Sequence, residues 1–357
     1  MSKKVTMQQI ADYLGVSKFV VSRSLSGKEG VNSTTRDQVF DAAAKLGYYS
    51  QKNKKINQPI ENQESRPNRN NKNEIVLVLM QNIRHQTKDS SYWGKIVDGI
   101  SCTLEDLGIG IFVMTESNVE KLTTVLNPKH FIGAIGVGVI SAPLLLEVDR
   151  MKLPIILIDY EDPLIRCDTI FNNNFDCSYH LTNHLIGLGH KQIQFIGDIN
   201  YSRSFYDRWL GFRSSLEQNN LTAKRDASLE TIDNSEIEMH FENWFIEKTN
   251  SFLSTAFVCA NDNIATRVIS VLKKFNMNVP DDLSIVGFDN KEITYQMSPT
   301  LTTVDIAKSG LGKRAVEMLL KRISEKNAPF EKVLLAGTIM LRESTSKVRD
   351  VVNDFED

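Results

Sequence analysis

Short apolar runs alternate with helical stretches through most of this chain, and that alternation constrains its fold more than any other feature. Residues 75–80 read IVLVLM, an unbroken apolar run that is typical of a strand buried on both faces. Similar runs predict strands at 110–114, 132–139, 154–159, 192–196, 256–260 and 283–288. The stretches between them predict helices at 92–107, 142–152, 175–188, 204–219, 235–249, 262–275 and 308–324. We therefore predict an α/β fold in which helices cover both faces of parallel sheets.

The number of predicted strands exceeds what one compact sheet holds, so we expect two similar lobes within residues 75–346. The predicted boundaries are about 75–160 with 291–324 for the first lobe, and about 161–290 with 325–346 for the second. An acidic tail, residues 347–357, follows. Ligands of open α/β sheets bind beyond the carboxyl ends of the strands, so we expect a ligand site in a cleft between the lobes.

Residues 1–49 show a different pattern, in which short helices are separated by tight turns. Gly15 can end a first helix in the left-handed conformation, and Ser17 can cap a second helix two residues later. A third helix can follow, capped by Asn32 or Ser33 and closed by Gly47. The inner faces of these helices carry Ile10, Ala11, Leu14, Val20, Val21, Leu25, Val39, Ala43 and Leu46. This order indicates a three-helix head with a helix-turn-helix.

In a helix-turn-helix, the second helix lies in the major groove of DNA. Lys18 can donate to guanine, Phe19 can contact a thymine methyl group, and Arg23 can reach a base or a phosphate. The alternative is a small protein-binding module whose Lys and Arg side chains are solvated. The residues that we expect at the DNA are Thr6, Ser17, Lys18, Phe19, Ser22, Arg23, Asn32 and Thr35.

The charge distribution favours DNA binding. The net charge is −2, but residues 1–73 hold 13 Lys and Arg against 6 Asp and Glu, and the remainder holds 29 against 38. A basic head on an acidic body is typical of a protein that binds nucleic acid through the head alone. Residues 50–74 are strongly polar and contain Pro59 and Pro67, so we expect a flexible linker between the two.

Several other classes of protein are disfavoured. No apolar run approaches the roughly 18 residues of a membrane helix, and the N-terminus has no secretory signal pattern. His180 and His184 have metal-ligand spacing but no evident third ligand, so we expect no metal site, no cofactor and no catalysis. The cysteines form no CxxC pair, and we interpret them as buried thiols of a cytoplasmic protein: Cys102, Cys167, Cys177 and Cys259.

Residues 5–48 resemble the DNA-binding head of the lactose/galactose repressor family. The shared patterns are IAxxxGVS, VSRxLxG, TRxxV and LGY. The body adds further matching stretches: PIILID at 154–159, RWLGF at 208–212, LSIVGFDN at 283–290 and LTTV at 301–304. The resemblance implies a DNA-binding transcription regulator whose body has the periplasmic sugar-binding-protein fold. In that family the residues that match Lys18, Phe19 and Arg23 read the operator.

The linker departs from the family pattern. The family usually carries a hinge that reads RPNxxARxL, whose leucine enters the minor groove, whereas this chain has YSQK at 49–52. The resemblance therefore implies that the hinge helix is missing or displaced, and that coupling between effector and DNA is looser than usual.

The resemblance also implies a set of effector-binding residues. Arg208 matches an arginine that grips the effector, and Asp289 matches an acidic residue that accepts from hydroxyl groups. Five members have a named structural alternative: a surface cation for Arg208, a turn or cap residue for Asp289, a helix cap for Asn261, and core packing for the aromatic pair. The full set is Tyr92, Trp93, Asp159, Ser204, Arg208, Asn261 and Asp289.

These observations predict a cytoplasmic repressor that binds a near-palindromic operator as a homodimer and is controlled by a sugar-like effector. Leu104, Leu107 and residues 119–126 are candidates for the dimer surface. One rival is a DNA-binding regulator whose body no longer binds a sugar and is controlled by a protein partner or acts constitutively. A second is a pure solute-binding protein, against which the basic head argues.

Overall fold

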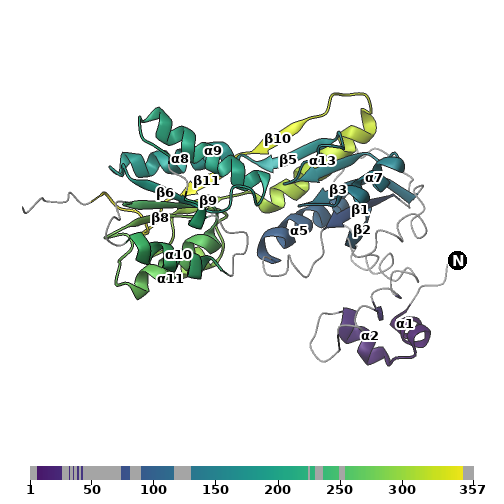
Figure 1. Ribbon diagram of the computed structural model, residues 1–357. Coiled ribbons are helices and arrows are strands. Elements are labelled where there is room, and N and C mark those ends of the chain that lie inside the picture. The colour runs from purple at the N-terminus through teal and green to yellow at the C-terminus, as the bar shows by residue number, and fades with distance from the viewer. Residues whose placement is uncertain are drawn as a thin grey trace, which may run out of the picture. The chain divides into compact units, whose positions relative to one another are not determined.

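The computed structural model divides the chain into two compact units, Met1–Lys72 and Asn73–Asp357, which we call the head and the body (Figure 1). The predicted linker up to residue 73, the hinge position, the tail beyond residue 348, and Ala43 and Leu46 of the third helix lie outside the described residues. The structure describes residues 6–25, 32, 35, 38, 39, 42, 74–80, 90–115, 130–223, 226–229, 236–248 and 254–348.

In the head, two short helices meet at a glycine turn. Helix α1 (Met7–Leu14) begins with a reciprocal capping box, in which the Thr6 hydroxyl accepts from the Gln9 N–H and the Gln9 side chain accepts from the Thr6 N–H. It ends at Gly15, whose φ of 65° lies in the left-handed region that suits glycine. Helix α2 (Lys18–Leu25) follows. A small core joins them to helical residues of the third segment: Ile10, Ala11, Val21, Val39 and Ala42.

The first lobe of the body contains a six-stranded parallel sheet in the order β10-β5-β4-β3-β1-β2. Alternate residues of β1 face opposite sides: Val76 and Val78 pack with helices α5 and α13, and Leu77 and Leu79 pack with α7. The strands are β1 (Ile75–Met80), β2 (Gly110–Thr115), β3 (Phe131–Val137), β4 (Ile155–Ile158), β5 (Asp168–Asn172) and β10 (Lys332–Leu335). The helices are α5 (Ser90–Asp106), α7 (Ala142–Arg150) and α13 (Lys308–Ser324).

The second lobe contains a three-stranded parallel sheet, β6-β7-β8, with helices on both faces (Figure 1). Its strands are β6 (Ile193–Ile196), β7 (Ala256–Cys259) and β8 (Ser284–Val286). Its helices are α8 (Asn174–Gly187), α9 (Arg203–Gln218), η5 (Ala227–Leu229), α10 (Ile237–Lys248), α11 (Asp262–Lys274) and α12 (Ile293–Gln296). A separate antiparallel pair joins β9 (Thr303–Asp305) to β11 (Thr338–Met340). The predicted α/β fold with parallel sheets is confirmed.

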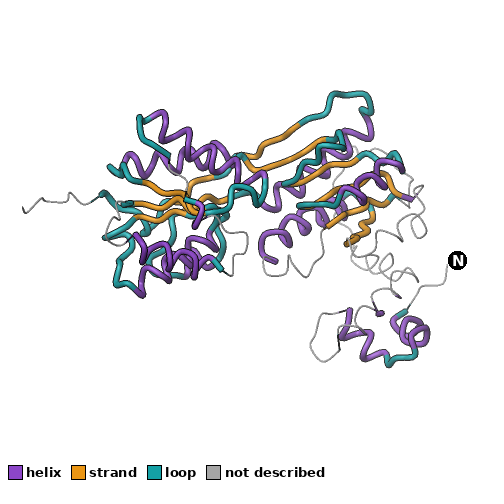
Figure 2. The backbone as a smooth tube through the Cα atoms, in the orientation of Figure 1, coloured by secondary structure: helices purple, strands orange, loops and turns teal. Residues whose placement is uncertain are grey.

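Two strands lie in a different lobe from the one that their ranges predict. Strands β5 and β10 fall within the ranges expected for the second lobe, yet they extend the sheet of the first lobe beyond β4 (Figure 2). The sequence pattern predicts neither strand, because the polar residues Asp168 and Asn172 at the ends of β5 leave only a short apolar stretch, and β10 alternates between exposed and half-buried residues. Asp168 is accommodated because Arg322 of α13 donates two hydrogen bonds to its carboxylate, at 2.7 and 2.8 Å.

Two expectations about burial are wrong. Cys102 is exposed rather than buried, and Leu104 is fully buried, so it cannot contribute to a dimer surface. Leu104 lies on the side of α5 that packs against the sheet, whereas Leu107 is exposed beyond the end of that helix. Residues 119–126 lie outside the described part of the chain. None of the described helices is long and apolar enough to cross a membrane.

The last described residues, 344–348, are held to the second lobe by hydrogen bonds near a buried histidine. His190 is 3% exposed. Its Nδ1 lies 2.9 Å from the Thr255 hydroxyl, and its Nε2 lies 3.0 Å from both the Ser284 hydroxyl and the Ser346 carbonyl oxygen. Burial lowers the pKa of His190, although the bond to Ser346 opposes that effect. The second lobe therefore contains a neutral histidine that holds the chain's C-terminal segment.

His190→Gln is expected to reduce the loss of body stability on acidification. The folded-state pKa of His190 is lowered, so the unfolded chain binds the proton first as pH falls below about 6.5, and the folded state loses stability in that range. Glutamine keeps hydrogen-bonding capacity but does not titrate. Urea unfolding at about pH 7.5 and about pH 5.5, followed by tryptophan fluorescence, measures the difference. Equal pH dependence in both proteins would contradict this assignment.

Candidate functional site

The head presents one face of α2 to solvent. Lys18, Phe19 and Ser22 are exposed, and Phe19 is 65% exposed. The guanidinium carbon of Arg23 lies 5.3 Å from the centre of that ring. This cation–π contact keeps the cation and the apolar ring together on one turn of the helix.

Three other predicted DNA-contact residues cap helices or helical turns. The Ser17 hydroxyl accepts from the Val20 N–H at 3.3 Å, and the Asn32 side chain accepts from the Thr35 N–H at 2.7 Å. Thr6 has the same role at α1. Capped helix N-termini present further N–H groups, which suit a phosphate oxygen.

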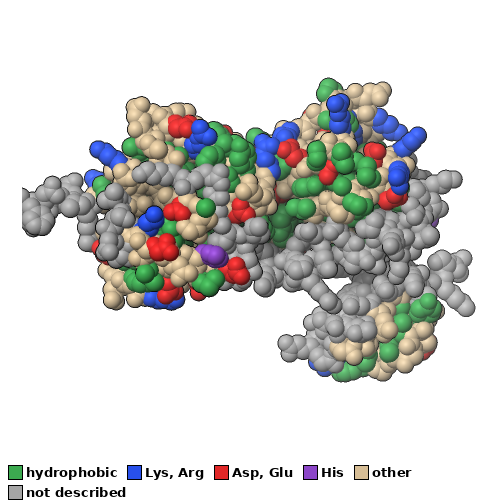
Figure 3. All heavy atoms as spheres, in the orientation of Figure 1, with side chains coloured by type: hydrophobic (Ala, Val, Ile, Leu, Met, Phe, Trp, Pro, Cys, Tyr) green, Lys and Arg blue, Asp and Glu red, His purple; other side chains and the backbone are tan. Residues whose placement is uncertain are grey.

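In the body, five predicted effector residues form one hydrogen-bonded network where the lobes join. Two come from the first lobe, from α5 and the end of β4, and three come from the second, from α9 and the end of β8. The network contrasts with the body surface, where charged side chains of both signs are dispersed (Figure 3). Its members are Tyr92, Asp159, Ser204, Arg208 and Asp289.

Asp159 connects the two lobes. One carboxylate oxygen accepts from the Ser204 hydroxyl of the second lobe, and the other accepts from the Tyr92 hydroxyl of the first lobe at 3.3 Å. Burial raises the pKa of Asp159 to about 6, while the Ser204 bond and the charge of Arg208 oppose that rise. Above that pH, Asp159 is a carboxylate that accepts from one hydroxyl of each lobe.

Arg208 is the cation at the centre of the site, and it is only 4% exposed. Its Nε donates to the Asn174 side chain at 2.9 Å, and its terminal nitrogens donate to the Ala260 carbonyl at 2.6 Å and to Asp289 at 3.3 Å. Its guanidinium carbon lies 3.7 Å from the centre of the Phe288 ring. The alternative of a surface cation is therefore wrong, because Arg208 is buried. The hydrogen bonds to its partners compensate for burying the charge.

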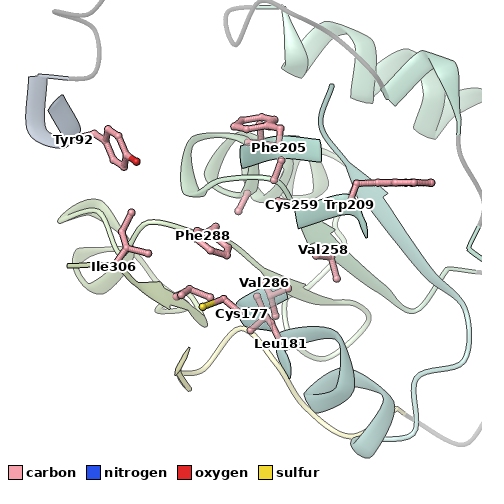
Figure 4. Close-up of a cluster of buried hydrophobic side chains, with 14 of the residues drawn as sticks. Tyr92, Cys177, Leu181, Phe205, Trp209, Val258, Cys259, Val286, Phe288 and Ile306 are labelled. Carbon is pink, nitrogen blue, oxygen red and sulfur yellow. The ribbon is translucent and has the colours of Figure 1, made fainter. Parts of the chain in front are cut away.

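Aromatic rings line the same region. Figure 4 shows Tyr92 of the first lobe facing Phe205 and Phe288 of the second lobe. Burial raises the pKa of Tyr92 well above its usual range, so its hydroxyl remains a donor to Asp159. Trp93 is half-buried and packs edge-on against Tyr92, with ring centres 4.8 Å apart.

Asn261 has the role of its structural alternative, a helix cap. Its side chain accepts from the Ile264 N–H at 2.9 Å at the start of α11. The next residue, Asp262, is fully buried and accepts from the Thr303 hydroxyl at 2.6 Å and the Lys291 N–H at 2.8 Å. Burial, aided by the charge of Asp289, raises the pKa of Asp262 to about 7. Among the residues described, no cluster of three or more His, Cys, Asp or Glu side chains is placed to hold a metal ion.

Three residues of the network are missing from the predicted set. Asn174 contacts both Arg208 and Ser204, the Asn172 side chain lies 3.5 Å from the Tyr92 hydroxyl, and Lys308 donates to the Asp289 carbonyl. A sequence signal exists for two of them, a run of three asparagines at 172–174. It points to a site only when the run is known to follow β5, a strand that the pattern does not predict.

A helix-turn-helix head and a two-lobed α/β body with a polar inter-lobe network define a class of DNA-binding transcription regulators. Residues 6–51 match the family model described as bacterial regulatory proteins of the lacI family. Residues 182–345 match the periplasmic binding protein-like domain. The two matches fall on the head and on the body, so the chain combines a lacI-type DNA-binding head with a periplasmic binding protein-like body.

Transcription regulators of similar sequence match nearly the whole chain. The HTH-type transcriptional repressor PurR of Histophilus somni is 28% identical over 348 residues, which cover 95% of this chain and 98% of that protein. The HTH-type transcriptional regulator RegA of Clostridium saccharobutylicum is 28% identical over 349 residues, which cover 95% of this chain and 99% of that protein. These relatives are transcription regulators rather than enzymes.

Solved structures show the same fold. The transcriptional regulator CelR in complex with cellobiose has a TM-score of 0.66 at 21% identity, covering 95% of this chain and 99% of that one. The lac repressor dimer bound to operator and the anti-inducer ONPF has a TM-score of 0.61 at 23% identity, covering 96% of this chain and 100% of that one. A regulator from Enterococcus faecium with bound ribose has a TM-score of 0.62 at 20% identity, covering 77% and 100%.

Proposed function

We propose that this protein is a transcriptional repressor whose operator binding is controlled by a sugar or sugar derivative held between the two lobes. The observation that carries the proposal is the network around Asp159 and Arg208, whose donors and acceptors come from both lobes. A polyol that exchanges hydrogen bonds with this network changes the contacts between the lobes. It can therefore shift the equilibrium between two lobe arrangements by its difference in affinity for them.

The proposed effector contacts are Asp159, Ser204, Arg208 and Asp289, with Tyr92 and Trp93 as the aromatic side of the site and Asn261 beside it. Hydroxyl groups can both donate to a carboxylate and accept from a guanidinium, which is the chemistry that this network uses internally. The fold neighbours CelR and the Enterococcus faecium regulator are described with cellobiose and ribose, which supports a sugar as the ligand class.

In the head, the exposed face of α2 is the proposed reading surface. Lys18, Phe19 and Arg23 would contact base edges, and the remaining proposed contacts to DNA are Thr6, Ser17, Ser22, Asn32 and Thr35. A single head makes few contacts, so two copies on a near-palindromic operator are proposed, with the protein acting as a cytoplasmic homodimer.

A thermal-shift screen of the full chain tests the effector proposal. The panel holds cellobiose, ribose, other mono- and disaccharides, and sugar phosphates. A ligand at 100 times its dissociation constant stabilises the folded state by about 2.7 kcal/mol. A hit should also change the affinity for operator DNA. A blank screen with a folded, DNA-binding protein would contradict sugar control.

A second candidate is a regulator whose body acts without a sugar, through a protein partner or constitutively. It is favoured by one observation, which is that Ser204 already donates to Asp159 and that Asn174 already bonds both Ser204 and Arg208. A blank screen together with strong operator binding would support it.

Arg23→Ala is expected to weaken operator binding by about 1–3 kcal/mol if Arg23 reads a base. Fluorescence anisotropy with the operator and with single-base variants measures the loss. A base contact predicts that discrimination at one position disappears. A uniform loss on every sequence, with a shallower salt dependence, would instead show a phosphate contact.

A further inference from the structure

Asn174 lies at a connection between the lobes. It is the first residue of α8 in the second lobe, and it follows β5 of the first lobe after one intervening residue. It is 1% exposed. Helix α9 approaches closely there because Gly211 lies against the backbone of Phe175 and Tyr179, where a larger side chain would collide. This close packing brings Arg208 and Ser204 of α9 within reach of the Asn174 amide.

The orientation of the Asn174 amide is fixed by its partners. Arg208 can only donate, so the oxygen of Asn174 must face its Nε, at 2.9 Å. The amide nitrogen then faces the Ser204 oxygen at 2.9 Å and the Asn172 carbonyl oxygen at 3.1 Å. Because Ser204 accepts from Asn174, its one hydroxyl proton is directed to Asp159.

We propose that Asn174 is a positioning residue that couples Arg208 to Asp159 through a hydrogen-bond relay with a fixed direction. The relay runs from the Arg208 guanidinium to the Asn174 amide, then to the Ser204 hydroxyl and the Asp159 carboxylate. A ligand hydroxyl that takes the place of one partner in this relay changes which hydrogen bonds the residue at the other end can make. The role in ligand recognition rests on the proposed function, but the relay itself does not.

The neighbouring asparagine has a different role. Asn173 caps α8, because its oxygen accepts from the Asp176 N–H at 3.3 Å and its nitrogen donates to the Asp176 carboxylate at 2.6 Å. Helix capping therefore does not need Asn174. Its two side-chain groups are engaged with Arg208, Ser204 and Asn172 instead.

Asn174→Asp is the variant that breaks the relay with the least change in shape. An aspartate still accepts from Arg208, but it cannot donate to Ser204 or to the Asn172 carbonyl. Ser204 then lies between two carboxylates with a single proton, so one acceptor loses its partner. Unfolding by urea at about pH 8 is expected to show an unfolding equilibrium constant raised by about tenfold or more. The three tryptophans, Trp93, Trp209 and Trp244, all lie in the body, so their fluorescence reports the body alone.

Adding Asp159→Asn to this variant is expected to restore the relay in the opposite direction. The new amide at 159 donates to Ser204, and Ser204 donates to the aspartate at 174. The double variant should recover the part of the loss that comes from Ser204, whereas the bond to the Asn172 carbonyl is lost in every Asn174→Asp variant, including the control below. The charge-matched control is Asn174→Asp with Asp289→Asn, which restores the number of carboxylates but leaves Ser204 between two acceptors.

The pH dependence gives a second readout that a purely structural role would not change. Asp159 is protonated below a pKa of about 6 and can then donate, so the defect of Asn174→Asp should shrink near pH 5. The charged and titratable groups around Asp159 are Tyr92 from α5, Arg208 from α9 and Asp289 after β8.

Rescue by Asp159→Asn and not by Asp289→Asn supports the relay. Equal rescue by both would show that only net charge matters and would overturn it, as would the absence of rescue. If Asn174→Asp does not accumulate as folded protein, the same comparison is made on soluble yield of the two double variants. No ligand is present in these measurements, so a blank sugar screen leaves the relay standing, and a failed rescue leaves the sugar proposal standing.

Discussion

Arg208→Ala is expected to destabilise the body by about 3–5 kcal/mol and to abolish any response to a ligand between the lobes. The guanidinium is buried and pairs with Asp289, and its removal deletes the hydrogen bonds that it donates to that carboxylate, to the Asn174 oxygen and to the Ala260 carbonyl. Urea unfolding followed by tryptophan fluorescence measures the loss of stability. The head is a separate unit, so a folded variant should still bind the operator but ignore every ligand that stabilises the wild type.

The matched control is Arg213→Ala, five residues further along the same helix. Arg213 is exposed, pairs with Glu217 at 2.6 Å and lies over the Trp209 ring of the same helix, so its loss should change stability by less than about 1 kcal/mol. Arg208→Lys should fall between the two, because one ammonium group cannot reproduce the three directions of a guanidinium. If Arg208→Ala were as stable as Arg213→Ala, the buried hydrogen bonds of Arg208 would not contribute to the stability of the body.

Periodicity in the sequence was sufficient for the fold class, for a physical reason. Strands that are buried on both faces by apolar packing alone are apolar at successive positions, so β1 and β4 are visible as IVLVLM and IILI without any knowledge of their neighbours. The glycine turn of the head is equally local, since Gly15 alone decides where α1 ends. Features that depend on contacts between neighbouring residues are therefore recoverable from sequence.

The inter-lobe network depends on contacts between residues distant in sequence, and it is only partly recoverable. Arg208 and Asp289 are 81 positions apart, and Tyr92 and Asp159 are 67 apart. The resemblance to a family supplied these positions, whereas Asn174 had no equivalent support. The orientation of the Asn174 side-chain amide is set by partners that are distant in sequence. No local sequence pattern distinguishes Asn174 from Asn173, whose amide caps a helix.

Arg322→Ala is the second prediction with a large expected effect, a loss of about 3–5 kcal/mol in the free energy of unfolding. Arg322 and Asp168 are 154 positions apart, and both are buried. Arg322 also donates to the Pro329 carbonyl at 2.8 Å, while Asp168 accepts from the Glu331 N–H at 2.7 Å. One ion pair thus joins α13, the start of β5 and the segment before β10, which explains why a strand can begin with a buried aspartate.

The same helix provides the control and the test of mechanism. Arg314→Ala removes a half-buried arginine whose side chain pairs with Glu317 at 3.0 Å, and it should cost less than about 1 kcal/mol. If the penalty at Arg322 arises from the uncompensated charge of Asp168, then Arg322→Met combined with Asp168→Leu should recover most of the stability. If the double variant is as unstable as Arg322→Ala, the essential contribution of Arg322 is its bonds to the backbone before β10 rather than neutralisation of Asp168. The two outcomes therefore separate charge burial from strand anchoring at the edge of the first lobe's sheet.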